Sequence, residues 1–314
     1  MKIPSYGDVV TAHRRIKPFI NKTPVLTSSY LNNLLKCELF FKCENFQKVG
    51  AFKYRGATNA MLSLSREELQ RGVATHSSGN HAQALALAAK TFGSRATIIM
   101  PKNSPIVKQR AVAGYGADII FCEPTLESRQ QTLQEFVDKT GAIFIHPYNK
   151  FEIICGQATA AKELIEEVGW LDYILVPVGG GGLLSGTAVV TKTLMPNASV
   201  VAAEPSGADD AARSFRSGKL QLSVSPQTIA DGLRTSLGEL TFEIIKHYVD
   251  DIITETDENI IQAMKLIWER MKIIIEPSSA VPIAAVISNQ GVFEGKRVGI
   301  IISGGNVDLD NLPW

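Results

Sequence analysis

From residue 72 onward, short runs of β-branched and apolar residues alternate with longer stretches in which apolar positions follow helical spacing. The apolar runs are of strand length, and the stretches between them are long enough to form helices. The predicted strands are residues 38–43, 73–75, 96–100, 118–121, 142–145, 174–178, 199–203 and 297–302. Helices are predicted to begin at Asn80, near Ser104 and at Thr125. This alternation predicts an α/β fold with mainly parallel sheets and helices on both faces.

Ligands in such sheets bind beyond the carboxyl ends of the strands. Four segments rich in glycine or polar residues occupy that position here. They are residues 76–81, 179–182, 204–210 and 303–308. The binding site is therefore expected where these loops meet.

Gly179, Gly180, Gly181 and Gly182 follow a buried-strand pattern and lead into a helical stretch. Without side chains, their backbone N–H groups can close on phosphate oxygens at the positive end of the helix. No lysine follows them as in a P-loop, and the spacing of a dinucleotide fingerprint is absent, so a small phosphorylated cofactor is favoured. A flexible glycine linker is the alternative.

Lys53 lies between aromatic residues and two positions before Arg55. Partial burial and a neighbouring cation would both lower the pKa of its amine, which favours Schiff-base formation near neutral pH. Taken alone, Lys53 would more often be a solvated helix residue.

Four motifs occur in order along the chain: Phe52-Lys53, Ser77-Ser-Gly-Asn-His81, the four glycines, and Ser303-Gly-Gly-Asn-Val-Asp308. The whole sequence resembles the fold-type II pyridoxal-phosphate enzymes, which are similar in fold to the tryptophan synthase β chain. Within them it resembles the serine racemase and serine/threonine dehydratase group. Further segments that carry the resemblance are residues 202–210, 229–238, 268–272 and 276–278.

The resemblance implies where pyridoxal 5'-phosphate would bind. Lys53 would form the Schiff base, with Phe52 beside the ring and Asn80 bonded to its phenolic oxygen. The four glycines and the Leu183 amide would hold the phosphate, and Ser303 would face the ring nitrogen. A neutral hydroxyl there favours proton chemistry and β-elimination over transamination. Gly232 and Tyr148 would line the cofactor cleft.

Racemisation requires a base on each face of the substrate Cα. The resemblance implies Lys53 on one face and Ser78 on the other, whereas simple dehydratases often carry alanine at the second position. Ser78 could instead cap the helix that begins at Asn80. The substrate carboxylate would lie against Ser77, Asn80 and His81. Further substrate contacts would come from Arg129 and Thr235, either of which could be an ordinary surface residue.

Two accessory sites also follow from the resemblance. Glu204, Asp210 and the Ala208 carbonyl would provide three oxygens for Mg²⁺ or Ca²⁺, although a solvated acidic loop is the simpler interpretation. ATP would bind as an effector at a dimer interface, through Ser28, Ser29, Lys48, Gln83, Tyr115, Lys272 and Asn306.

The resemblance implies a homodimer of two-lobed chains. Residues 1–71 and 150–314 would form the large cofactor-binding lobe, and residues 72–149 a small mobile lobe that closes to exclude water. The expected activity interconverts L- and D-serine, with side elimination to pyruvate and ammonia. The alternatives are an ammonia-lyase acting on threo-3-hydroxyaspartate, threonine or serine, and a non-catalytic sensor of an amino acid or nucleotide.

Composition narrows the choice of partners. The 314 residues include 32 basic and 31 acidic side chains, a net charge of +1, without a basic cluster suited to nucleic acid or an anionic membrane. We find neither an apolar signal region nor a run long enough to span a bilayer. Four scattered cysteines favour buried, reduced thiols, so a cytoplasmic protein that binds a small molecule is expected.

Overall fold

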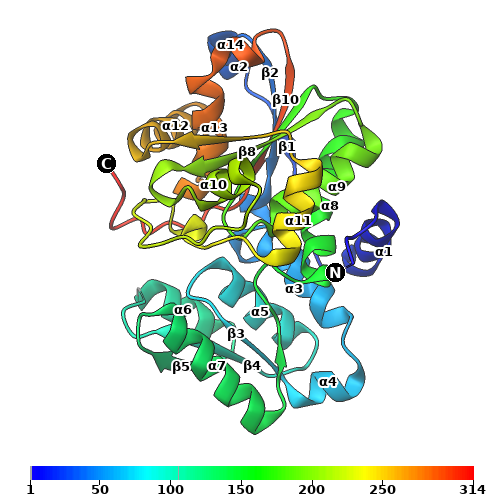
Figure 1. The fold of residues 1–314 in the computed structure, drawn as a ribbon, viewed down its shortest axis with the longest axis vertical. Helices are drawn as coiled ribbons and strands as arrows, with labels where there is room; N and C mark the ends of the chain where they lie inside the picture. The colour runs from blue at the N-terminus through cyan, green and yellow to red at the C-terminus, as the bar shows by residue number, and fades with distance from the viewer. Residues whose placement is uncertain (1, 105) are drawn as a thin grey trace.

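The structure, a computed structural model, describes residues 2–104 and 106–314. Two sheets organise this part of the chain (Figure 1). The strands are β1 Val25–Leu26, β2 Glu38–Cys43, β3 Val73–His76, β4 Ala96–Pro101, β5 Asp118–Cys122, β6 Ile143–Phe144, β7 Tyr173–Pro177, β8 Ser199–Pro205, β9 Asp251–Glu255 and β10 Arg297–Ile302. Each predicted strand is present, with ends shifted by at most two residues.

The larger sheet has six strands in the order β1-β2-β10-β7-β8-β9, and the smaller has four in the order β5-β4-β3-β6. Every pairing is parallel except that of β1 with β2. The α/β class with mainly parallel sheets is thus confirmed. All strands of the small sheet lie within residues 73–144, and the strands outside this range form the large sheet. The mobility of the small lobe and its limits at residues 72 and 149 stay a prediction.

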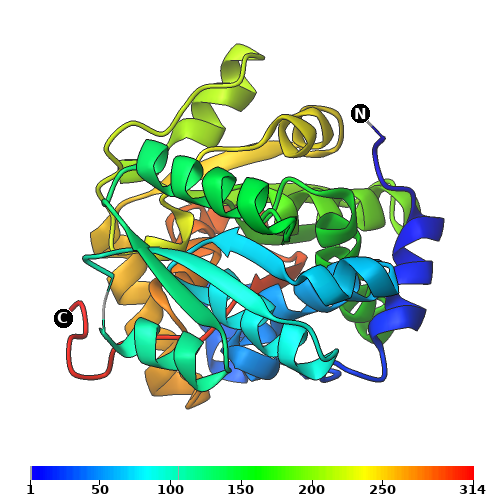
Figure 2. The same ribbon diagram turned by 90° about the horizontal axis from the view of Figure 1, so that it is seen from below.

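Helices cover both faces of each sheet. They are α1 Tyr6–Ile16, α2 Ser29–Leu35, α3 Lys53–Leu62, α4 Arg66–Arg71, α5 Asn80–Thr91, α6 Ile106–Gly114, α7 Leu126–Thr140, α8 Phe151–Val168, α9 Gly182–Leu194, α10 Asp210–Ser217, α11 Glu239–Tyr248, α12 Asp257–Met271, α13 Pro277–Ser288 and α14 Gln290–Phe293. In the large lobe, one apolar cluster joins the sheet to α2, α12 and α13, and another joins it to α8, α9 and α11. In the small lobe, α5 and α7 pack on opposite faces of the sheet (Figure 2).

Helix α3 joins the two lobes. Its buried side packs on α8 of the large lobe and on α5 of the small lobe. The helix begins at Lys53, so this packing determines where that lysine lies. The loops after β3, β7 and β10 approach the same region, which lies between the upper and lower lobes in Figure 1.

The four cysteines are free and buried, as the sequence predicts. No helix in the described part of the chain is both long and apolar enough to cross a membrane.

Candidate active site

Lys53 begins α3 at the junction of the lobes. Its Nζ donates to the carbonyl oxygen of Pro147 at 3.0 Å and lies 5.1 Å from the centre of the Phe52 ring. Burial lowers the pKa of Lys53 to about 8, although the nearby Glu276 carboxylate acts in the opposite direction. An appreciable fraction of the amine is therefore neutral near pH 8.

The proposed influence of Arg55 on Lys53 is wrong. Arg55 is fully buried and donates to both Glu44 and Glu163, with nitrogen to oxygen distances of 2.6–2.8 Å. Its charge is paired inside the large lobe, so burial remains the cause of the low Lys53 pKa. The sequence position of Arg55, two residues after Lys53, suggested proximity, but a step of two residues along a helix points side chains to different faces.

A buried ion cluster surrounds Arg55. We use this name for Lys42, Glu44, Arg55 and Glu163, of which none is more than 4% exposed. Lys42 donates to Glu163 at 2.7 Å and to the Thr23 carbonyl at 2.7 Å. Burial alone would raise the pKa of Glu163, but hydrogen bonds from His13 and Arg55 hold it well below its usual range. The cluster links β2, α3 and α8, and the sequence analysis did not identify it.

The glycine loop, residues 179–182, lies between β7 and α9 and is buried. A Cβ on Gly180 would lie 2.3 Å from the Tyr148 ring, and Gly181 has a left-handed φ of +85°. Side chains are therefore excluded at both positions. In the part of the chain described here, the N–H groups of residues 179–183 find no acceptor within the protein. Unpaired donors at the start of a helix fit a phosphate group.

Tyr148 and Gly232 contact the two sides of this loop. The Tyr148 hydroxyl lies 3.1 Å from Thr235 Oγ1, so the structure brings a predicted cofactor residue next to a predicted substrate residue. A Cβ on Gly179 would lie 3.3 Å from the Gly232 carbonyl oxygen. The assignments of Tyr148, Gly232 and Thr235 to ligand contacts stay predictions.

Ser303 follows β10 and is buried. Its carbonyl accepts from Phe52 N at 3.0 Å, which places it beside the start of α3. Its hydroxyl lies 3.0 Å from Ser279 Oγ, which also donates to the Gly304 carbonyl. Ser279 thus orients the loop that carries Ser303, and the sequence analysis did not single it out.

Asn80 connects the two lobes. Its Nδ2 lies 3.0 and 3.1 Å from the two carboxylate oxygens of Glu276, and its Oδ1 accepts from Asn306 Nδ2 at 2.9 Å. Burial raises the pKa of Glu276 to about 7, despite the hydrogen bond from Asn80. Glu276 is a second group near Lys53 that the sequence analysis left without a role. Its only sequence signal was the segment 276–278 that carried the family resemblance.

The loop Ser77–Gly79 connects β3 to α5. Helix α5 has no side-chain cap, so the alternative that Ser78 caps it is wrong. Ser77 Oγ accepts from Gly79 N at 3.4 Å. His81 is buried, with Nε2 3.2 Å from the Ile145 carbonyl, and burial holds its pKa well below the usual value.

Arg129 lies on α7, where its Nε donates to the Thr125 carbonyl at 3.3 Å. Burial, together with the nearby charge of Arg129, lowers the pKa of His76 at the end of β3 to about 4. The structure thus puts Arg129 near the substrate loop, and its contact with substrate stays a prediction.

Glu204 is near the end of β8, Ala208 ends the short helix that follows, and Asp210 begins α10. Glu204 accepts from Ala211 N at 2.9 Å and from Ala212 N at 2.8 Å. Both Asp210 oxygens are buried and lack a hydrogen-bond partner among the described residues. Burial raises the pKa of Glu204 to about 8 and that of Asp210 to about 6. Unpaired buried carboxylate oxygens fit a hard cation.

The predicted nucleotide positions fall into two groups. Ser28 and Ser29 begin α2, next to Tyr30, whose ring is covered by Arg270 near Lys272. The other positions lie around α5 and the short helix Lys48–Gly50: Asn306 donates to the Val49 carbonyl at 2.8 Å and to Asn80. This second group comprises Lys48, Gln83, Tyr115 and Asn306.

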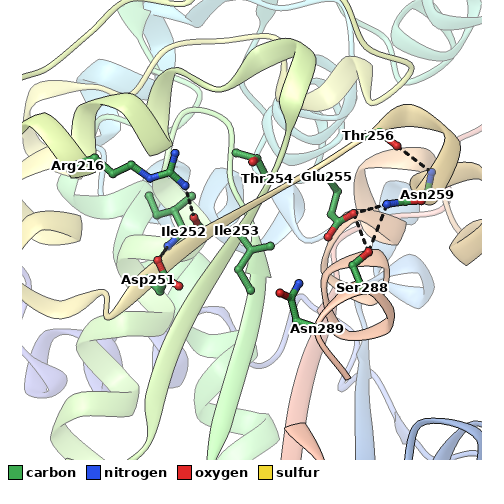
Figure 3. A pocket seen from close by; sticks show the side chains of 10 residues that line it. All are labelled: Arg216, Asp251, Ile252, Ile253, Thr254, Glu255, Thr256, Asn259, Ser288 and Asn289. Carbon is green, nitrogen blue, oxygen red and sulfur yellow. Dashed lines mark hydrogen bonds between the residues drawn. The ribbon is translucent and has the colours of Figure 1, made fainter. Parts of the chain in front are cut away.

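A pocket of about 450 Å³ lies elsewhere, beside the outer strand β9 (Figure 3). Its polar side chains bond to one another and to the strand: Glu255 accepts from Asn259 and Ser288, and Arg216 donates to the Ile252 carbonyl. None of the predicted site residues lines it. This pocket is therefore separate from the junction of the lobes.

Comparison with known proteins agrees with this geometry. The family model described as "Pyridoxal-phosphate dependent enzyme" matches residues 16–304. The chain is 51% identical to beta-hydroxyaspartate dehydratase of Paracoccus denitrificans, over all of both chains. It is 52% identical to serine racemase of Dictyostelium discoideum, over 97% of this chain and 95% of that one. The structure of maize serine racemase matches with a TM-score of 0.96 at 44% identity, covering 98% of this chain and 95% of that one.

The family resemblance inferred from sequence motifs is thus confirmed, and with it the pyridoxal-phosphate cofactor that the unpaired donors of the glycine loop fit. The chain belongs to the pyridoxal-phosphate dependent enzymes.

Proposed function

We propose that the protein interconverts L- and D-serine and also eliminates water from serine, which leads to pyruvate and ammonia. Relatives about half identical to this chain carry both kinds of activity in their names. The observation that carries the racemase proposal is Ser78, whose hydroxyl lies in the loop before α5 without serving as its cap. A loop hydroxyl free of that structural role is available as a second base.

Pyridoxal phosphate, when bound, supplies an electron sink that acidifies the Cα proton of an amino acid. The chain's own groups then determine what happens to that proton. Lys53, with its pKa of about 8, takes or returns the proton on one face of Cα. Ser78 does so on the opposite face, while Ser77, Asn80 and His81 hold the substrate carboxylate. Ser303 provides a neutral hydroxyl near the ring nitrogen.

A second candidate is elimination from 3-hydroxyaspartate, which one relative's name indicates. That substrate carries an additional carboxylate, which a cation near the substrate loop would bind. Arg129, on α7 beside His76, is suited to this contact. An ammonia-lyase acting on threonine would need no such cation.

The function is tested by incubating the purified enzyme with L-serine and pyridoxal phosphate and measuring D-serine and pyruvate separately. We expect both products. D-serine, L-threonine and threo-3-hydroxyaspartate are assayed in parallel. Pyruvate without D-serine, together with a preference for threo-3-hydroxyaspartate, would establish the ammonia-lyase instead.

The Ser78→Ala variant tests the second base. We expect D-serine formation from L-serine to fall by about 10²-fold or more, because a positioned acid or base contributes about 10²–10⁴-fold. Pyruvate formation from L-serine is the internal control and should change much less, since Lys53 remains. Equal loss of both products would contradict a specific role in racemisation.

We also propose that Glu204, Asp210 and the Ala208 carbonyl bind Mg²⁺ or Ca²⁺. The support is the pair of unpartnered Asp210 oxygens close to a second buried carboxylate. Because the site lies at the end of β8 and not at Lys53, the ion would stabilise the segment that joins β8 to α10 and take no part in the chemistry.

The Asp210→Asn variant is expected to lose the rise in Tm that millimolar Mg²⁺ produces in the unmodified protein. Binding to the folded state alone raises stability, so loss of the site removes that increment. The matched control is Asp209→Asn, because Asp209 is a neighbouring carboxylate that pairs with Arg213 at the surface. An unchanged response of the Asp210 variant to Mg²⁺ would place the ion elsewhere.

The remaining assignments are proposals that follow from the family. We propose a homodimer and an ATP effector site formed by the two groups of nucleotide positions described above. A cytoplasmic location fits the four buried free cysteines, because reducing compartments keep thiols unpaired.

A further inference from the structure

The crossover segment, Ile145–Asn149, connects β6 of the small lobe to α8 of the large lobe. Four of its five residues contact part of the candidate site or the element next to it. The Ile145 carbonyl lies 3.2 Å from His81 Nε2, and the Pro147 carbonyl accepts from Lys53. Tyr148 packs against the glycine loop, and Asn149 Oδ1 accepts from two N–H groups at the start of α11. The conformation of this segment therefore determines several positions in the site at once.

His146 is the remaining residue, and its side chain folds back onto the segment. Nδ1 of the ring accepts from Asn149 N at 3.0 Å and from Tyr148 N at 3.3 Å. An imidazole nitrogen can accept only when it carries no proton. The ring must therefore be neutral, with its proton on Nε2. In this form it closes a turn around Pro147.

The surroundings of His146 keep the ring neutral. It lies edge to face against Tyr148, with 4.6 Å between ring centres, and beside Phe144. The titratable groups that face it are His76 on β3, His81 on α5, Lys53 on α3 and Lys150 before α8. Burial lowers the pKa of His146 to about 3, with smaller contributions from His76, Lys53 and Lys150.

We propose that His146 is a positioning residue, whose Nδ1 holds the crossover segment so that the Pro147 carbonyl meets Lys53 and the Tyr148 ring packs against the glycine loop. The inference rests on the proposed roles of Lys53 and the glycine loop, but not on which reaction the enzyme catalyses. Without the Nδ1 acceptor, the N–H groups of Tyr148 and Asn149 lose their partner, and the turn relaxes toward conformations in which water satisfies them.

Three variants distinguish the role of the Nδ1 acceptor from that of the bulk of the ring. In His146→Asn, the amide oxygen takes nearly the position of Nδ1 and can accept the same two bonds. His146→Leu keeps comparable bulk without an acceptor. His247→Leu is the control for replacing a histidine by leucine, because His247 is exposed on α11, outside the candidate site, and accepts neither of these N–H groups.

The measurement is the dissociation constant of pyridoxal phosphate from each apoenzyme by fluorescence titration, which does not depend on turnover. We expect His146→Leu to bind at least tenfold more weakly, and His146→Asn and His247→Leu to stay within threefold of the unmodified protein. A His146→Leu variant that binds like His247→Leu, or a His146→Asn variant as weak as His146→Leu, overturns the proposal.

A second measurement, made on the unmodified protein, tests the proposal even if the His146→Leu variant does not fold. In the unmodified protein, the ¹⁵N resonances of His146, assigned by comparison with His146→Asn, should show an unprotonated Nδ1 and a protonated Nε2 at pH 7. A proton on Nδ1 would overturn the proposal. A failure of the serine racemase assignment would leave both measurements unaffected, since neither uses an amino-acid substrate.

Discussion

Replacing Lys53 with alanine is expected to lower both racemisation and elimination by about 10⁴-fold or more. In the proposed function Lys53 would both join the cofactor covalently and act as the base on one face of Cα, so one substitution removes two contributions. The residual rate is measured from D-serine and pyruvate formation after dialysis with excess pyridoxal phosphate. Lys53→Arg is the matched variant, because it keeps a cation at the site but cannot form the Schiff base.

The lowered pKa of Lys53 predicts how cofactor uptake depends on pH. Because only the neutral amine attacks an aldehyde, the rate at which apoenzyme takes up pyridoxal phosphate should rise from pH 6.5 to about 8 and then level off. Glu276→Gln removes the negative charge that opposes the effect of burial, and should shift this profile to lower pH. A rate that keeps rising to pH 10 would show that burial does not lower the Lys53 pKa.

Replacing Arg55 with methionine is expected to lower the free energy of unfolding by about 3–5 kcal/mol, the usual cost of removing one partner from a buried pair. Arg55 is fully buried and is the main partner of Glu44, which would be left charged and without its cation. Urea denaturation followed by circular dichroism measures the change. In the Arg55→Met background, adding Glu44→Gln should restore part of the loss, because the uncompensated charge disappears.

The control for this experiment is Lys36→Met. Lys36 pairs with Glu294 at the surface, where both side chains are more than half exposed. Solvent screens such a pair, so no measurable change in unfolding free energy is expected. If Arg55→Met proves as mild as Lys36→Met, the buried ion cluster does not stabilise α3.

The spacing of apolar residues, together with the glycine and polar residues between the apolar runs, was sufficient to predict most of the strands and the α/β class. The predicted strand at residues 297–302 lies centrally in the large sheet, although it is far in sequence from its neighbours β2 and β7. The sequence does not predict this order, because hydrophobic period reports local exposure and not which strands pair. The outer strand β9 was not anticipated, although Ile252, Ile253 and Thr254 are β-branched and the segment begins with an aspartate like the predicted strand at residues 118–121.

The residues of the candidate site also fall into those that the sequence identifies and those that it does not. Lys53, the glycine loop and Ser303 could be identified from residue type and order along the chain. Only lysine provides a side-chain amine for a Schiff base, and only glycine leaves the start of a helix without side chains. Glu276, Ser279 and His146 could not, because each acts through a partner distant in sequence or through the fold of its own loop. The error over Arg55 has the same origin: its neighbours are set by the helix direction and by Glu44 and Glu163.

By itself, the sequence determined the family, the cofactor and the glycine loop, since these depend on local residue types in a particular order. Only the tertiary structure decided the environment of Lys53. Burial at the start of α3 lowers its pKa, and the crossover segment supplies its hydrogen-bond partner. The physical reason is that desolvation and hydrogen bonding depend on which groups packing brings together. The distance between these groups along the chain does not show that they are in contact.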